Sequence, residues 1–129
     1  MKKSRFITLL LVVFLSLTAC NKVSHNGNLD GQWRIITIEN IESGVINEPQ
    51  QLFYCFNLHT ANLTRGGVWY TANMVYDYPK LSLDFPYNKP GELDDWGIYS
   101  TDVTFQIVLL NSSSLILRSD QVIINLQKF

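Results

Sequence analysis

The sequence predicts an all-β protein, an antiparallel up-and-down β-barrel of seven to eight strands. Two observations support this fold class. After the first 30 residues the chain consists of short segments in which apolar and polar residues alternate, and turn-forming residues separate these segments. In addition, no stretch of helical period is longer than two turns. A barrel of about eight strands is either filled by its own side chains or holds one small ligand.

The first 19 residues have the pattern of a leader sequence. Three Lys or Arg residues stand among the first five residues, an apolar run follows over 6–17, and small residues come after it. This order is typical of a secretory signal peptide, and the run is shorter than the ~20 residues that span a membrane. We therefore expect residues 1–19 to be a signal peptide, residues 20–28 to form a tether and residues 29–129 to form the barrel domain.

The charge of the predicted mature chain excludes one class of partner. The 129 residues include 10 Lys or Arg and 11 Asp or Glu, and the leader removes three of the basic ones. Seven basic residues then face eleven acidic ones. A mildly acidic domain without a basic stripe is poorly suited to nucleic acid, so we expect no nucleic-acid partner. Its length suffices for a real core, so disulfides are not required.

The end of the leader, LTAC at 17–20, resembles the bacterial lipobox. That resemblance implies a diacylglycerol on the sulfur of Cys20, cleavage just before this residue, and attachment to a membrane by acyl chains. The alternative is ordinary secretory cleavage with a free or bridged cysteine. Asn21 and the non-acidic residues 22–25 follow. By resemblance to known lipoprotein sorting signals, they imply an outer-membrane anchor that faces the periplasm rather than the cell surface.

The expected strands follow in order along the chain. They span 33–39, 52–64, 68–76, 81–85, 103–109, 115–117 and 122–128. The first is rich in β-branched residues, and Gly66-Gly67 suits a tight turn between the second and the third. The first half of 52–64 is apolar on both faces, so it is either covered outside or meets a partner. A bend in this run would supply an eighth strand.

The long connection over 86–102 breaks the strand pattern, and we expect a single helical turn that ends at Gly97. Glu92, Asp94 and Asp95 cluster on this connection beside a tryptophan. An acid–base pair is conceivable here, as is recognition of a sugar or a cation. The favoured interpretation is a solvated loop, because acidic residues suit the first turn of a helix.

The opening Gly31-Gln32-Trp33 resembles the G-x-W motif of lipocalins. That resemblance implies that Trp33 plugs one end of the barrel beneath a basic side chain, for which Arg118 and Lys128 are the candidates. A longer pattern, NGNLDGQW, FYCFNLH, DDWGIY and LNSSSLILRSDQVIINLQKF, resembles lipocalin-like lipoproteins of the Bacteroides group from about Asn26 onward. It implies a barrel on a lipid tether and implies no activity.

Catalytic and metal chemistry is not expected. The chain has only two histidines, His25 and His59. Cys55 and His59 share one strand face but stand about 13 Å apart at ~3.3 Å per residue, so they cannot share a zinc ion. Cys55 has no base in its strand, and we expect it to pack as a small hydrophobe. We therefore expect no metal, no cofactor and no enzymatic activity.

Two functions remain open. In the first, the barrel binds a small apolar ligand or an envelope component. Aromatic residues beside loops would then rim the opening, and the candidates are Tyr76, Tyr78, Tyr87, Trp96 and Tyr99. In the second, the protein is a structural or partner-binding envelope lipoprotein with a filled barrel. The two-sided apolar start of 52–64 would then be its contact surface.

Overall fold

A computed structural model describes residues 25–129; the predicted signal peptide and Cys20 therefore lie outside the described residues. The described chain forms nine β segments and two single-turn 3₁₀ helices. In chain order these are η1 (Gly27–Leu29), β1 (Gly31–Asn40), β2 (Ile46–Asn47), β3 (Phe53–Asn57), β4 (Thr60–Arg65), β5 (Val68–Asp77), β6 (Lys80–Asp84), η2 (Asp94–Trp96), β7 (Asp102–Leu110), β8 (Ser114–Arg118) and β9 (Val122–Lys128).

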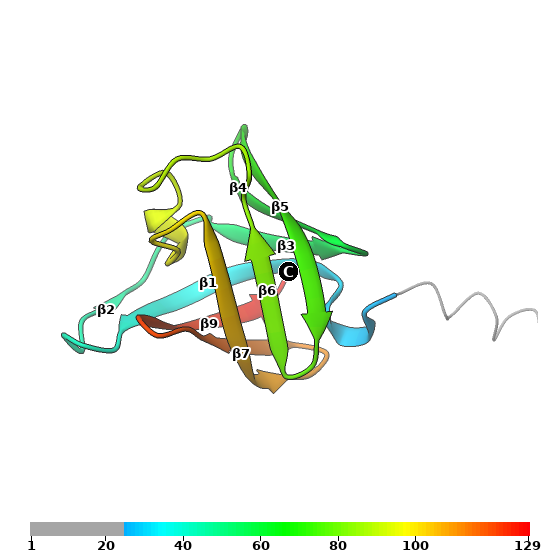
Figure 1. Cartoon of the computed structure of the whole chain (residues 1–129). Helices are drawn as coiled ribbons and strands as arrows, with labels where there is room; N and C mark the ends of the chain where they lie inside the picture. The colour runs from blue at the N-terminus through cyan, green and yellow to red at the C-terminus, as the bar shows by residue number, and fades with distance from the viewer. Residues whose placement is uncertain (1–24) are drawn as a thin grey trace, which may run out of the picture.

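The strands close into an antiparallel barrel (Figure 1). From β3 to β9 each strand pairs with the next one along the chain, and β1 pairs with both β3 and β9. The two-residue β2 is an addition that pairs with β1. The predicted run 52–64 divides at Leu58, whose φ of 56° reverses the chain between β3 and β4. This division supplies the eighth barrel strand, and the predicted fold class is confirmed.

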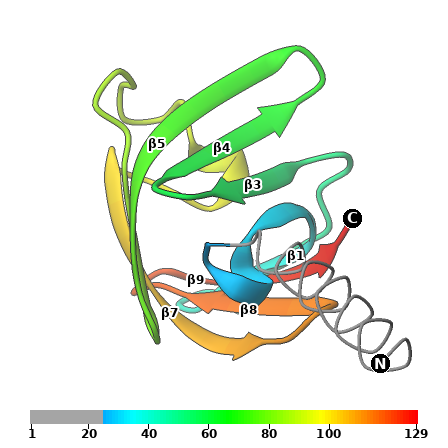
Figure 2. The same ribbon diagram turned by 90° about the vertical axis from the view of Figure 1, so that its right-hand side faces the viewer.

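The up-and-down order gives the barrel two distinct ends. The closed end holds η1 and the turns at 58–59, 78–79 and 111–113; the mouth holds the connections 41–52 and 85–101 and the turns at 66–67 and 119–121. Figure 1 shows η1 and η2 on opposite sides of the barrel, and Figure 2 shows the strands curving around its interior. Every residue on a turn is thereby assigned to one end.

Two β-bulges decide which side chains face the interior. Between Ile35 and Thr37 the register of β1 with β9 shifts, so the buried series continues at Ile38 rather than at Thr37. In β7 a shift after Ile107 leaves Leu109 41% exposed. Strict alternation predicts that Leu109 faces the interior, and this prediction is wrong because the extra residue inverts the alternation.

Trp33 and Lys128 fasten the closed end. Trp33 is fully buried and donates its Nε1 hydrogen to the carbonyl of Leu29, at 2.8 Å. The Nζ of Lys128 lies 4.4 Å from the centroid of the Trp33 ring and donates to the carbonyls of Asn28 and Asp30. Burial lowers the pKa of Lys128, and the nearby Asp30 carboxylate opposes this shift. The ammonium thus joins η1 to the last strand.

Glycine is required at position 31 by this arrangement. Its φ of +126° lies in a region that side chains rarely adopt, and a Cβ there would stand 2.9 Å from the Nζ of Lys128. Of the two basic candidates for the position over Trp33, Lys128 occupies it. Arg118 is exposed on β8, where its strand neighbours are Gln106 and Ile123.

The connection between β6 and β7 covers the mouth. Leu93, Trp96 and Ile98 are buried in the core, and the hydroxyl of Tyr54 donates to the carbonyl of Trp96 at 2.6 Å from inside the barrel. The predicted helical turn is η2, and it ends at Gly97 with φ of 83°. A Cβ on Gly97 would meet Ile124, Ile38 and Val122 at 3.1–3.4 Å, so the connection lies directly on the core.

The closed end can be tested by replacing Lys128 with methionine. Lys128→Met keeps an unbranched side chain over the indole but removes two hydrogen bonds and the cation–π contact. We expect the free energy of unfolding to fall by about 1–2 kcal/mol in urea titrations. Arg118→Met is the matched control, since it removes a basic residue that is exposed, and should change stability by less than about 0.5 kcal/mol. Equal losses in the two variants would contradict the proposed role of Lys128.

The covered mouth can be tested with Tyr54→Phe. Loss of the hydroxyl that binds the Trp96 carbonyl should cost about 1 kcal/mol of unfolding free energy at neutral pH. Burial raises the pKa of Tyr54 well above its usual value, and Tyr99 adds to the rise. Above pH ~10 the unfolded chain therefore loses this proton while the native chain keeps it, and native stability falls as pH rises. Since phenylalanine has no such proton, the gap between wild type and variant should narrow in alkali. A difference in unfolding free energy that stays constant between neutral and alkaline pH would contradict this explanation.

Candidate functional site

The interior of the barrel is filled by the protein's own side chains. The largest of these are at most 2% exposed: Trp33, Trp96, Tyr54, Phe56, Phe85 and Phe105. The Tyr54 ring centroid lies 5.9 Å from that of Phe56 and 6.4 Å from that of Phe105, distances typical of packed aromatic pairs. These side chains occupy the space that a small apolar ligand would need, so the candidate sites lie at the mouth and on the outer surface.

The five aromatic residues predicted to rim an opening do not meet. Tyr76 and Tyr78 lie at the closed end, because β5 runs away from the mouth. Trp96 is fully buried beneath the connection that covers the mouth, and Tyr87 is 94% exposed on that same connection. Only Tyr99 lines a hollow at the mouth. Up-and-down topology separates Tyr76 and Tyr78 from the other three, because successive turns point to opposite ends. Burial of Trp96 separates it from Tyr87 and Tyr99 on the same connection.

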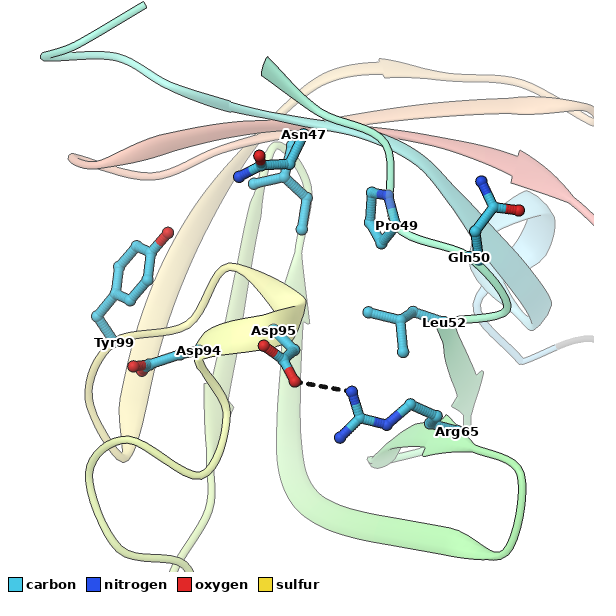
Figure 3. A pocket seen from close by; sticks show the side chains of 9 residues that line it. Asn47, Pro49, Gln50, Leu52, Arg65, Asp94, Asp95 and Tyr99 are labelled. Atoms are coloured by element: carbon cyan, nitrogen blue, oxygen red, sulfur yellow. Dashed lines mark hydrogen bonds and ion pairs between the residues drawn. The ribbon is translucent and has the colours of Figure 1, made fainter. Parts of the chain in front are cut away.

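The mouth hollow has a volume of about 360 Å³ and lies between the connection 41–52 and η2 (Figure 3). Its lining is mixed, with Ile38 and Leu52 on the barrel side and Arg65, Asp95 and Tyr99 toward solvent. The lining also includes Asn47, Pro49, Gln50 and Asp94. Figure 3 shows the Arg65 guanidinium reaching across to η2, where it pairs with Asp95 at 2.7 Å. This pair closes one side of the hollow.

The acidic cluster on the covering connection holds its own backbone and neighbours. Glu92 accepts a hydrogen bond from the backbone N–H of Lys89 at 2.6 Å, and Asp95 is paired with Arg65. Arg65 also lies over the Trp96 ring, with its Cζ 5.0 Å from the ring centroid. These contacts favour a structural role for the cluster. The indole N–H of Trp96 is buried without a hydrogen-bond partner among the described residues.

A larger hollow of about 620 Å³, which we call the aromatic groove, lies on the outer wall. It is lined by Gln32, Arg34, Gln51, Phe53, Cys55, Thr64, Gly66, Trp69 and Phe129. Strand register assembles it, because Arg34, Phe53, Thr64 and Trp69 are consecutive partners across β1, β3, β4 and β5. Cross-strand partners project from the same face of a sheet, so these four side chains form one row.

Two exposed aromatic rings line the aromatic groove. Trp69 is 62% exposed and Phe129 is 75% exposed, and the Phe129 ring packs edge-to-face on Phe53 with centroids 5.2 Å apart. The sequence indicated the Phe53 side of this surface through the two-sided apolar run. Trp69 lies in the predicted strand 68–76 and was not among the predicted site residues. The available signal was the run of apolar residues 68–70, which no single-faced strand needs.

Cys55 is half-buried, lines the aromatic groove and is the unpaired cysteine of the described chain. Burial raises the pKa of its thiol, while a hydrogen bond with the Thr64 side chain acts in the opposite direction. A thiol with a raised pKa is a weak nucleophile. Among residues 25–129 there is no group of three or more His, Cys, Asp or Glu side chains that could hold a metal ion.

Over the same described range, no helix is long and apolar enough to cross a membrane. Cys20, the predicted site of lipid attachment, lies outside that range.

Comparison with known proteins supports the fold described above. The family model of a lipocalin-like domain matches residues 15–129. The structure is similar to that of a lipocalin-like protein from Bacteroides uniformis, with a TM-score of 0.66 and 21% identity, covering 80% of this chain and 100% of that one. An uncharacterized protein from Bacteroides eggerthii gives a TM-score of 0.64 at 12% identity, covering 78% and 99%. No curated protein matches the sequence. The chain therefore belongs to the lipocalin-like domain family.

Proposed function

We propose that this protein is a lipid-anchored bacterial envelope protein that binds a protein partner through the aromatic groove. This proposal rests mainly on one observation: side chains fill the barrel interior, whereas the aromatic groove of about 620 Å³ lies on the outer wall. The barrel then serves as a rigid scaffold that holds the groove in shape. We propose no enzymatic activity, since Cys55 is hydrogen-bonded to Thr64 and the carboxylates of Glu92 and Asp95 have structural partners.

The composition of the groove favours a protein partner. Tryptophan and arginine are the residues most enriched where binding energy concentrates in protein interfaces, and apolar centres of interfaces are ringed by polar groups. Trp69 and Phe53 supply the centre here, with Gln32 and Gln51 at the rim. Arg34 carries the one charged side chain of the lining. A partner that offers an apolar side chain beside a carboxylate would fit this arrangement.

The anchor is proposed from the lipobox at Cys20. Each acyl CH₂ buried in a bilayer contributes ~0.8 kcal/mol, and two or more chains hold a protein stably at the membrane. The residues after Cys20 lack the acidic signal of surface export, so we place the protein on the periplasmic face of the outer membrane.

Binding of a small apolar ligand is the second candidate. The mouth hollow has apolar walls in Ile38 and Leu52, and the buried indole N–H of Trp96 lacks a partner within the described chain. A ligand there would lie against the covering connection rather than inside the barrel. Organic extraction of protein purified from its native membrane, followed by mass spectrometry, would reveal it as a stoichiometric compound.

The groove is tested by photo-crosslinking in cells. A benzophenone-bearing phenylalanine at Trp69 should give one dominant protein adduct after irradiation, and the same residue at the 94% exposed Tyr87 serves as the control. Trp69→Ser should then weaken affinity for the captured partner by at least about tenfold, as expected of a central aromatic contact. Identical adducts from both positions, or full affinity of the serine variant, would contradict the groove as the contact surface.

The anchor is tested with Cys20→Ser. The wild-type mature protein should have a mass above that of the chain beginning at Cys20 by the mass of its acyl groups, and should sediment with membranes. The serine variant should keep its signal peptide or appear in the soluble fraction, because no thioether can form. A wild-type protein of unmodified mass would contradict the anchor and leave the groove to be judged by crosslinking alone.

A further inference from the structure

The two ends of the barrel differ strongly in charge. Nine of the eleven acidic residues stand at the mouth: Glu39, Glu42, Glu48, Asp84, Glu92, Asp94, Asp95, Asp102 and Asp120. Three basic residues, Arg65, Lys89 and Arg118, share that end. The mouth therefore carries about six net negative charges. At the closed end, Asp30 and Asp77 are matched in number by Lys80 and Lys128, and Arg34 on the adjoining side wall adds one positive charge.

The chain enters the barrel at the closed end. The Asn26 side chain donates to the carbonyl of Leu58 and to the Asp30 carboxylate, both at 2.8 Å. Lys128 in turn binds the carbonyl of Asn28 at 3.0 Å. These contacts fix the exit point of the N-terminal segment beside the turn at 58–59. Only five peptide links separate His25 from Cys20, and at ~3.6 Å per residue they span at most ~18 Å.

Turns at the closed end also expose large apolar side chains. Leu58 is 51% exposed and holds a left-handed φ of 56°, a conformation that glycine or asparagine adopts at lower cost. Tyr78 is 62% exposed on the next turn at this end, and Val108 is 57% exposed beside the third. The mouth also exposes apolar side chains, among them Val45, Ile46 and Tyr87, but most of the acidic residues share that end. Charge, rather than exposed apolar surface, therefore distinguishes the two ends.

We propose that the closed end is a membrane-facing surface, resting on anionic lipid headgroups while the acidic mouth points away. This inference rests on the proposed acyl anchor at Cys20. A negatively charged bilayer surface attracts basic segments and repels acidic ones within a Debye length of about 10 Å. Tyrosine favours the interface between headgroups and water, which suits Tyr78. Because the link between His25 and Cys20 spans at most ~18 Å, it keeps the closed end close to the bilayer.

The orientation leaves the proposed partner site accessible. The row of Arg34, Phe53, Thr64 and Trp69 crosses the side wall of the barrel, and Trp69 lies at the start of β5 near the mouth. A protein in the aqueous compartment can reach this wall while the closed end rests on the bilayer. The mouth hollow likewise opens to solvent.

Two exposed tyrosines provide a matched test. The acylated full-length mature protein, with Cys55→Ser, carries a nitroxide at Tyr78→Cys or at Tyr87→Cys and is reconstituted in phosphatidylethanolamine vesicles containing phosphatidylglycerol as the minor lipid. Intact mass first establishes acylation. Collision with a water-soluble nickel chelate should be several-fold lower at position 78 than at 87, and collision with oxygen should be higher.

A second measurement avoids the cysteine changes. A benzophenone-bearing phenylalanine at Tyr78 should crosslink to phospholipid, seen as a lipid-sized mass increase, and at Tyr87 it should not. Equal or reversed values in an acylated sample would overturn the orientation while leaving the anchor intact. A mature chain without acyl groups would instead overturn the anchor and the orientation together.

Discussion

Filling the barrel interior is the constraint on which the rest of the structure depends. An eight-stranded barrel has an interior just wide enough for side chains, and a long closed sheet leaves two open ends that expose apolar atoms. Here Trp33 closes one end and Trp96 covers the other, both fully buried. The strands contribute the aromatic and aliphatic side chains between them. Since the interior is occupied in this way, recognition is left to the outer wall and the ends.

The two ends of the barrel are closed by different interactions. At the closed end Lys128 acts within its own sheet, because Trp33 and Lys128 are register partners on β1 and β9, and its ammonium also satisfies carbonyls of the segment around η1. At the mouth the cover comes from outside the sheet. Its attachment combines the Tyr54 hydroxyl inside the barrel with the Arg65–Asp95 pair at the surface. Exposed ion pairs contribute little stability, so burial of Trp96 and its neighbours holds the cover in place.

Period-2 alternation was sufficient to predict the fold class and most strands, because one face of each strand must be buried. It failed where backbone irregularities shift that alternation. A β-bulge places Leu109 on the outside of the barrel. Leu58 follows the end of β3 and has a left-handed backbone conformation, which leucine does not favour and which the sequence therefore does not indicate. The candidate site was harder to predict. Trp69 and Arg34 are 35 positions apart in the sequence, and only the register of four strands puts them in one row. By contrast, the resemblance to lipocalins implied a basic side chain over Trp33 and left Arg118 and Lys128 as candidates, and the structure has Lys128 in that position.

Apolar probes measure most directly whether the barrel interior is filled. Apolar cavities of the size of a small aromatic molecule bind benzene or xenon, whereas packed cores do not. Methyl NMR of the barrel-lining residues Leu63, Leu117 and Ile124 under xenon pressure or with benzene should show no saturable shifts. Saturable shifts concentrated on these methyl groups would reveal an interior binding site, contradict the filled barrel, and return a small apolar ligand to first place.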